Sequence, residues 1–297
     1  MTNEKTAMIT ICGRPNVGKS TLTNALVGEK IAIVSDKPQT TRTRITAIVD
    51  KGDTQFVLMD TPGFHKPRTR LGDYMVNLVK DSVADVDAAL LLAEPECAIG
   101  PQERELIRRI EETKAPAVLA INKIDTVEKS ALLGVIAEYS KAHEFSAIVP
   151  ISAKTGEGLD ELMDELAKFA AVGPHLFPDD MITDQPERQI CAELVREKLL
   201  NCLDKEVPHG TAVEITKFHE REDGLVEIDA TIYCEKDSHK GIIIGKHGAM
   251  LKKIGEQARV DMEQFLDTKV FLQTWVKVKE NWRDSQTQLK NFGFKNE

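Results

Sequence analysis

The chain has 297 residues, of which 41% are hydrophobic and 29% charged, and this length and composition suit a soluble protein of two globular domains. Its formal net charge of −9 excludes a uniformly basic nucleic-acid binder, so any nucleic-acid surface must be a local patch. No apolar run approaches the about 18 residues that span a bilayer, and the polar N-terminus carries no secretory segment. The five cysteines lack C-x-x-C spacing, so free thiols in a reducing cytoplasm are expected, with any contact to the inner face of the cell membrane only peripheral.

The first 170 residues are expected to alternate short buried strands with amphipathic helices. The predicted strands are 7–12, 45–49, 56–59, 88–92, 117–121 and 147–151, and the predicted helices are 20–26, 101–113, 128–142 and 158–169. Such alternation is typical of an α/β domain with a mostly parallel, doubly wound sheet that is covered on both faces. We assign residues 1–172 to this domain.

The pattern changes after residue 172. Residues 173–186 contain three prolines and no periodicity, which indicates a linker. The remaining segment, 187–297, is predicted to form a small α+β domain. Its predicted helices are 187–203, 249–265 and 281–289, and its predicted strands are 212–218, 226–233 and 270–278. Trp275 and Trp282 are expected to belong to its core.

A phosphate-binding loop is the first chemical signal. Residues 13–20 read Gly-Arg-Pro-Asn-Val-Gly-Lys-Ser, which fits G-x-x-x-x-G-K-[ST] between a predicted strand and a predicted helix. The loop N–H groups and the positive end of the helix dipole would surround phosphates. Lys19 would reach the β- and γ-phosphates, and Ser20 would bind Mg²⁺. The residues assigned to phosphate binding here are Gly13, Asn16, Val17, Gly18, Lys19, Ser20 and Thr21.

Two further segments are expected to meet these phosphates. Asp60 ends a predicted strand, where a carboxylate can hold Mg²⁺, and the glycine of Asp60-Thr61-Pro62-Gly63 can bring its N–H close to the γ-phosphate. The basic loop 37–44 contains two adjacent threonines. One of them, Thr40 or Thr41, could complete the Mg²⁺ shell when a γ-phosphate is present.

Guanine recognition is predicted at the ends of the next strands. In Asn122-Lys123-Ile124-Asp125, the carboxylate of Asp125 can accept both N1–H and N2–H₂ of guanine, a donor pair that adenine lacks. The stem of Lys123 can lie over the base, and Asn122 can join this segment to the phosphate loop. One strand later come Ser152, Ala153 and Lys154, where the Ala153 N–H can donate to guanine O6.

With these motifs in order, residues 1–170 resemble the Ras-like P-loop GTPases, on their Era/TrmE/EngA side. The resemblance implies GTP and GDP as ligands, Thr41 as the metal-binding threonine, and a K⁺ ion beside Asn16. Phe64 stands where Ras-like enzymes carry the glutamine that orients water. Hydrolysis is therefore expected to be slow unless K⁺, backbone groups or a partner fill that role.

The second domain carries an RNA signal. Gly245-Lys246-His247-Gly248 fits the G-x-x-G loop with which KH domains clamp four nucleotides, and the window 239–253 holds four lysines, two histidines and no acid. The predicted element order fits a type II KH domain. The residues assigned to RNA binding are Ile242, Ile244, Gly245, Lys246, His247, Gly248, Lys252 and Lys253. Whether His247 would contact a base or a phosphate stays open.

The C-terminal segment Trp275-Val276-Lys277-Val278-Lys279-Glu280-Asn281-Trp282-Arg283-Asp284 extends the resemblance to the Era family over nearly the whole chain. That resemblance implies a GTP-hydrolysing switch that binds the 3′ end of 16S rRNA in the assembling 30S subunit. No coiled-coil seam demands a dimer, so a monomer is expected. Two alternatives remain: an RNA chaperone whose nucleotide only stabilises the fold, and a GTPase regulating the cell cycle or metabolism with RNA as effector.

Overall fold

The computed structural model describes residues 4–63, 69–81 and 86–294. These residues divide into two compact units. The first contains the phosphate loop and ends at Asp184. The second contains Gln185–Glu297, and it also includes the segment Ile33–Thr40 and a short stretch ending at Tyr74.

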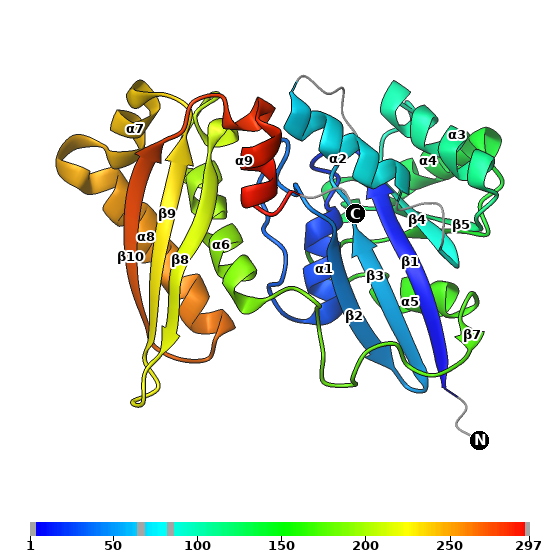
Figure 1. Cartoon of the computed structure of the whole chain (residues 1–297). Coiled ribbons are helices and arrows are strands. Elements are labelled where there is room, and N and C mark those ends of the chain that lie inside the picture. Colours follow the sequence, from blue (N-terminus) through cyan, green and yellow to red (C-terminus); the bar gives the residue numbers. More distant parts are fainter. Residues whose placement is uncertain (1–3, 64–68, 82–85, 295–297) are drawn as a thin grey trace. The chain divides into compact units, whose positions relative to one another are not determined.

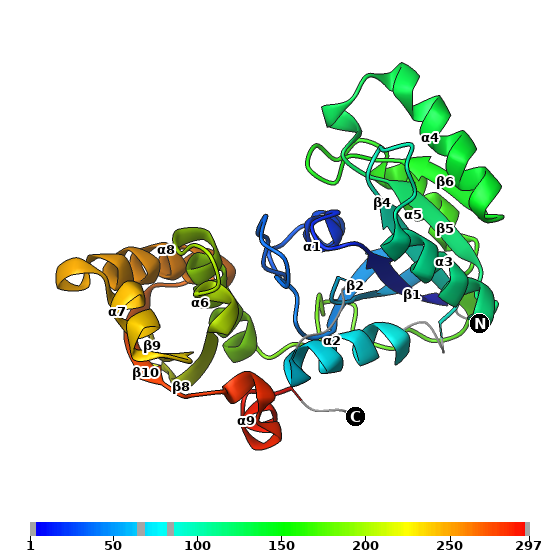
Figure 2. The ribbon, with the colours of Figure 1, turned by 90° about the horizontal axis from the view of Figure 1, so that it is seen from above.

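The first unit is built on one mixed sheet, which Figures 1 and 2 show from two directions. Its described strands run in the order β2-β3-β1-β4-β5-β6, and β7 pairs with β1. The pairings of β1 with β3 and β4, and of β5 with β4 and β6, are parallel, whereas β2 is antiparallel to β3. The strands are β1 Lys5–Gly13, β2 Ile45–Lys51, β3 Thr54–Asp60, β4 Ala88–Ala93, β5 Ala117–Ile121, β6 Ala147–Pro150 and β7 Ala171–Val172. The mostly parallel α/β fold that the alternation predicted is confirmed.

Helices cover both faces of this sheet, because successive side chains of a buried strand point to opposite sides. Ala88, Leu90 and Leu92 pack with α1 and α5 residues, whereas Ala89, Leu91 and Ala93 pack with α3 and α4 residues. The helices are α1 Lys19–Val27, α2 Arg70–Asp81, α3 Pro101–Thr113, α4 Lys129–Ala142 and α5 Leu159–Ala167, with a 3₁₀ turn, η1, at Ile124–Thr126. Helix α2 has no counterpart among the sequence predictions.

The segment predicted as a linker follows the sheet as an arm. Thr183 forms an antiparallel bridge with Ala47 and donates its hydroxyl hydrogen to the Thr46 carbonyl at 2.7 Å. The buried Gln55 side chain accepts hydrogen bonds from the N–H groups of Leu176 and Phe177. Residues 173–184 of the predicted linker therefore belong to the first unit, where they pair with its edge strand β2 at Ala47.

The second unit contains a three-stranded sheet in the order β10-β9-β8, with β10 parallel and β8 antiparallel to β9. Figure 2 shows helices α6 and α8 on one face of this sheet. Aliphatic side chains of these helices and of the strands form the core of the unit. The elements are α6 Glu187–Cys202, η2 Pro208–Gly210, β8 Ala212–Glu220, β9 Val226–Cys234, α7 Asp237–Ile244, η3 Lys246–Gly248, α8 Ala249–Phe265, β10 Val270–Val278, η4 Trp282–Asp284 and α9 Gln286–Asn291. This order matches the type II KH arrangement.

Two expectations for the C-terminal region were wrong. Trp282 is fully buried, and its indole N–H donates to the Gly210 carbonyl at 2.9 Å, but Trp275 is 42% exposed. The reason is that Trp275 lies on the outer face of β10, opposite to the side packed by α8. The predicted helix 281–289 is also divided into η4 and α9, because Ser285 caps a new helix by accepting a hydrogen bond from the Gln288 N–H.

Candidate functional site

The phosphate loop joins β1 to α1, as the motif predicts. Gly18 lies at φ 103°, and a Cβ there would come within 2.3 Å of the Asn122 side-chain nitrogen. The loop therefore needs glycine at this position both for its backbone conformation and for close approach to Asn122. The Lys19 Nζ is buried and donates to the carbonyls of Gly13 and Arg14 at 3.2 and 3.0 Å. Burial lowers the pKa of Lys19, and the nearby Asp60 opposes that shift.

Three oxygen-bearing side chains converge beside this loop. The Ser20 hydroxyl donates to Asp60 Oδ2 at 2.8 Å and lies 2.9 Å from the Thr41 hydroxyl. The second carboxylate oxygen of Asp60 is buried and has no hydrogen-bond partner among the described residues. Hydroxyl and carboxylate oxygens are the donors that Mg²⁺ prefers, so this unsatisfied oxygen fits a hard divalent cation. The Thr40 hydroxyl instead donates to the Lys37 carbonyl at 2.7 Å, so the geometry favours Thr41 as the metal-binding threonine.

The ionisation of Asp60 should make metal binding depend on pH. Burial raises the pKa of Asp60 to about 6, against the lowering effects of Lys19 and of the Ser20 hydrogen bond. This pKa is above its unfolded value, so the group lowers the free energy of unfolding as pH rises from about 4 to about 6. Because only the carboxylate binds Mg²⁺ well, Mg²⁺-dependent nucleotide affinity should fall about tenfold per pH unit below 6. Titrations at pH 5, 6 and 7.5 measure this, and a flat profile would contradict it.

Gly63 lies against the phosphate loop. A Cβ on Gly63 would come within 2.8 Å of the Cα and N atoms of Pro15, so this position accepts no side chain without movement of the loop. The role of its N–H near the γ-phosphate stays a prediction. Phe64, the residue that replaces the water-orienting glutamine, lies outside the described residues.

The predicted base-recognition segments form hydrogen bonds with each other and with the phosphate loop. The side-chain amide of Asn122 donates to the Val17 carbonyl at 2.8 Å, as expected for a link to the phosphate loop. Ser152 donates its hydroxyl hydrogen to Asp125 Oδ1 at 2.7 Å and so orients that exposed carboxylate. The Ala153 N–H, predicted to donate to guanine O6, donates here to Asn122 Oδ1 at 2.9 Å. Its contact with a base stays a prediction. Lys154 is exposed.

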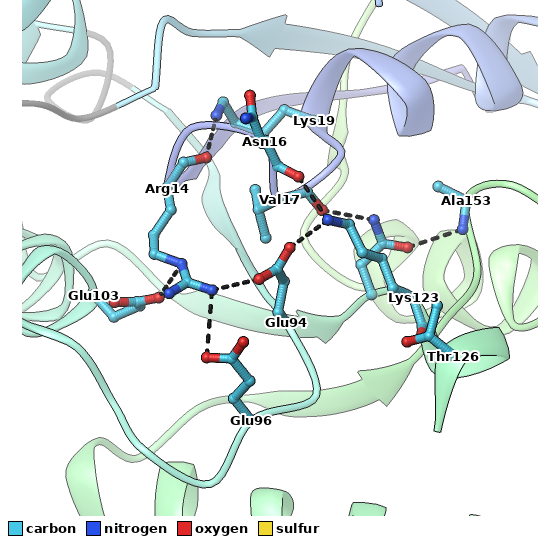
Figure 3. A network of polar contacts seen from close by, with 11 residues as sticks. Arg14, Asn16, Val17, Lys19, Glu94, Glu96, Glu103, Lys123, Thr126 and Ala153 are labelled. Atoms are coloured by element: carbon cyan, nitrogen blue, oxygen red, sulfur yellow. Dashed lines mark hydrogen bonds and ion pairs between the residues drawn. The ribbon is translucent and has the colours of Figure 1, made fainter. Parts of the chain in front are cut away.

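One charged residue of this site was missed from the sequence. Glu94 follows β4, and Figure 3 shows its carboxylate between Arg14 of the phosphate loop and Lys123 of the base segment. It accepts from Arg14 Nη2 at 2.5 Å and forms an ion pair with Lys123 Nζ. The sequence did offer a signal, because Glu94 is an acid directly after the buried strand β4. In the sheet, β4 lies between β1, which precedes Arg14, and β5, which precedes Lys123.

The G-x-x-G segment forms a sharp turn between α7 and α8. Gly245 has φ 71° and ψ 177°, and a Cβ there would lie 2.7 Å from the Met250 Cβ, so glycine is required. Gly248 also has positive φ, at 79°. Lys246 and His247 are exposed at the tip, as are Lys252 and Lys253 on α8.

Two isoleucines assigned to RNA binding lie at the end of α7, just before this turn. Ile242 is 50% exposed and Ile244 is partly exposed, whereas Ile243 between them is fully buried in the core. An apolar surface therefore lies beside exposed cations at the predicted RNA loop. At such a surface, the glycines allow the RNA backbone to come close to the protein backbone. The lysines can contact phosphates, and bases can pack on the isoleucines.

Two family models match parts of the chain. Residues 8–123 match the family described as 50S ribosome-binding GTPase, and residues 206–283 match the KH domain family. The chain is 52% identical over 291 residues to the GTPase Era of Ruminiclostridium cellulolyticum, covering 98% of both chains. It is 50% identical over 292 residues to the GTPase Era of Clostridioides difficile, again covering 98% of both.

Solved structures show the same likeness. One is a single-substitution variant of Aquifex aeolicus Era bound to GDP·AlF₄⁻, with a TM-score of 0.94 and 38% identity over 98% of this chain and all of that one. Another is Era in complex with MgGDPNP and nucleotides 1506–1542 of 16S ribosomal RNA. It has a TM-score of 0.94 and 38% identity over 99% of this chain and all of that one.

Proposed function

The chain belongs to the Era family of GTPases, and from this premise we propose that it is a GTP-driven assembly factor of the 30S ribosomal subunit. It would bind GTP and GDP with Mg²⁺, hydrolyse GTP, and bind the 3′ end of 16S rRNA through its KH domain. The observation that carries the proposal is the near-complete likeness to an Era structure holding both MgGDPNP and 16S rRNA nucleotides. Within the described residues, this chain has side chains suited to both ligands.

The nucleotide roles follow from the site geometry. Lys19 and the loop N–H groups would bind the phosphates, and Asp125 would select guanine through its two acceptor oxygens. Ser20, Thr41 and Asp60 would hold Mg²⁺, directly or through water, and the ion would neutralise the charge that develops on the phosphates. Thr41 would join only in the GTP state, so the loop that carries it would respond to the γ-phosphate.

We further propose that hydrolysis needs help beyond the chain itself. Phe64 cannot orient a water molecule, so intrinsic turnover should be about 10⁻⁴ to 10⁻³ s⁻¹, as in unassisted relatives of Ras. A K⁺ ion held at Asn16 would add positive charge beside the phosphates. Turnover should therefore be several-fold faster in KCl than in NaCl at equal ionic strength, with the increase reduced in Asn16→Ala. Equal rates in both salts would contradict a role for K⁺.

Contacts inside the second unit support a coupling between nucleotide and RNA. Residues 33–40 belong to this unit, and the Val34 N–H donates to the Glu197 carboxylate on α6 at 2.9 Å. Arg196 on the same helix donates to the Thr40 carbonyl, directly before the proposed Mg²⁺ ligand Thr41. A γ-phosphate that moves Thr41 would thus act on a segment bonded to the KH unit. Such coupling requires different RNA affinities in the two nucleotide states.

The proposed RNA target is the 3′ end of 16S rRNA rather than the large subunit, because the related structure contains 16S nucleotides. The exposed Lys246, His247, Lys252 and Lys253 would supply the charge contacts.

We place the protein in the cytoplasm as a monomer. No described helix is both long enough and apolar enough to cross a membrane, and any membrane association would be peripheral.

The Lys19→Ala variant tests whether the nucleotide acts as a switch. We expect it to bind RNA but to fail to restore mature 16S rRNA 3′ ends in cells depleted of the wild-type protein. Normal maturation by a variant shown to lack nucleotide binding would instead indicate an RNA chaperone. A normal 16S rRNA with a cell-cycle or metabolic defect would indicate a regulatory GTPase.

A further inference from the structure

The ends of three neighbouring strands bring charged residues together beside the proposed nucleotide site. Gly13 of β1 pairs with Leu92 of β4, and Ala93 of β4 pairs with Ile121 of β5. Because these strands are parallel, the residues that follow them meet at one edge of the sheet. Arg14, Glu94 and Lys123 are the charged residues delivered there, with Glu94 between the two cations (Figure 3).

The Arg14 guanidinium pairs with Glu94 and Glu103 and, at 3.7 Å, with the exposed Glu96. Its Nη2 lies 2.5 Å from Glu94 Oε2, and its Nε lies 2.7 Å from Oε1 of Glu103 on α3. Glu103 is almost fully buried, with 3% of its side chain exposed, so it can hold Arg14 in one position. The backbone carbonyl of Arg14 accepts a hydrogen bond from the phosphate-binding Lys19. Arg14 therefore joins the Glu94 carboxylate to the phosphate half of the site.

Lys123 is held by the same carboxylate. Its Nζ forms an ion pair with Glu94 Oε1 and donates to the Asn16 carbonyl at 2.8 Å, while its backbone has φ 65°. The two oxygens of Glu94 are thus divided between Arg14 and Lys123. A lysine side chain in solution samples many rotamers, and ordering it on ligand binding costs entropy. Because Glu94 already holds the Lys123 Nζ before a nucleotide binds, part of this entropy cost does not arise on binding.

We infer that Glu94 is a positioning residue for guanine nucleotides, because it fixes Lys123 in place for the base and links it through Arg14 to the phosphate loop. This inference rests on the proposed role of Lys123 in the nucleotide site. The Glu94 carboxylate pairs with Arg14 and Lys123, so it would act on the nucleotide through these two cations. Removal of the Glu94 side chain should therefore raise the rate at which the nucleotide dissociates.

The test measures the release of a fluorescent GDP analogue after a chase with unlabelled GDP. In Glu94→Ala, the dissociation rate should rise about tenfold, the effect of one rotamer-rich side chain that is no longer held in advance. In steady-state hydrolysis, KM for GTP should rise more than kcat falls. The dissociation rate of Glu94→Gln should lie between those of the wild type and Glu94→Ala, because the glutamine amide offers one acceptor oxygen instead of two.

A double-mutant cycle separates positioning from a general loss of stability. If Glu94 acts through Lys123, adding Glu94→Ala to Lys123→Ala should change the GDP dissociation rate less than about twofold. The matched control is Glu112→Gln, which breaks an exposed ion pair with Arg108 on α3 and should leave release unchanged. Thermal unfolding of the nucleotide-free variants shows whether folding is affected.

Two results would overturn the inference. One is a Glu94→Ala dissociation rate within about twofold of the wild type. The other is a full, roughly tenfold increase that persists in the Lys123→Ala background. Failure of the proposed nucleotide site itself would look different, because Asp125→Asn would then retain its preference for GTP over XTP. If Asp125 behaves as proposed and Glu94 does not, only the positioning role is lost.

Discussion

Asp125→Asn should convert a GTP-selective protein into one that prefers XTP. In xanthine the 2-amino group of guanine is replaced by a carbonyl, so an asparagine can accept from N1–H and donate to O2. With guanine, the amide N–H₂ of asparagine would instead face the N2–H₂ donor and leave both unpaired. We expect GTP affinity to fall by about 10³-fold or more, the scale on which a site matched to polar groups rejects a mismatched ligand.

Equilibrium binding of labelled GTP and XTP measures this exchange. Ser152→Ala is the companion variant, because it removes the 2.7 Å hydrogen bond that orients Asp125 without changing the charge. Its GTP affinity should fall only about five- to tenfold, because the net value of a typical hydrogen bond, here to an exposed carboxylate, is about 1 kcal/mol. Unchanged GTP preference in Asp125→Asn would show that the base lies elsewhere.

The second large effect is expected at the tip of the KH turn. Replacing both Lys246 and His247 by aspartate puts two negative charges where phosphates should pass, and RNA affinity should fall by about 100-fold or more. The milder Lys246→Ala should reduce the slope of log affinity against log salt by about 0.7, the value for one phosphate contact on a single strand. Binding to a 16S 3′-end oligonucleotide across salt concentrations measures both.

Lys205→Asp is the matched control for that charge reversal. Lys205 is exposed in the same unit but outside the G-x-x-G turn, and its positive φ of 56° is one that aspartate tolerates. RNA affinity should change little in this variant. If the loop variant and the control lose affinity equally, binding reflects general charge and not a clamp at residues 245–248.

The nucleotide site was the most predictable part of the molecule. Apart from Thr41, its residues lie at or just after the ends of β1, β3, β5 and β6 or at the start of α1, and parallel strands place their carboxyl ends at one edge. Ser20 and Asp60 are 40 residues apart in the chain, yet local motifs alone placed their side chains together. Short motifs suffice here because each one specifies its own turn and the sheet fixes their order.

Features that depend on distant packing were less predictable. Helix α2 was missed although Leu71, Met75 and Val76 are buried with helical spacing, because Gly72 near its start weakens the helical signal. The exposure of Trp275 depends on which face of β10 the helices cover, and alternation along a strand does not decide that. Glu94 joined the site only when β1, β4 and β5 were placed side by side.

If the nucleotide controls RNA binding, RNA affinity must differ between the GDP and GTP states of the protein. The purified protein is titrated with a labelled oligonucleotide copying the 3′ tail of 16S rRNA, once with GDP and once with a non-hydrolysable GTP analogue, at one stated salt concentration. We expect tighter binding with the analogue. Equal affinity in both states would contradict the switch, and no binding in either would also contradict the assigned RNA target.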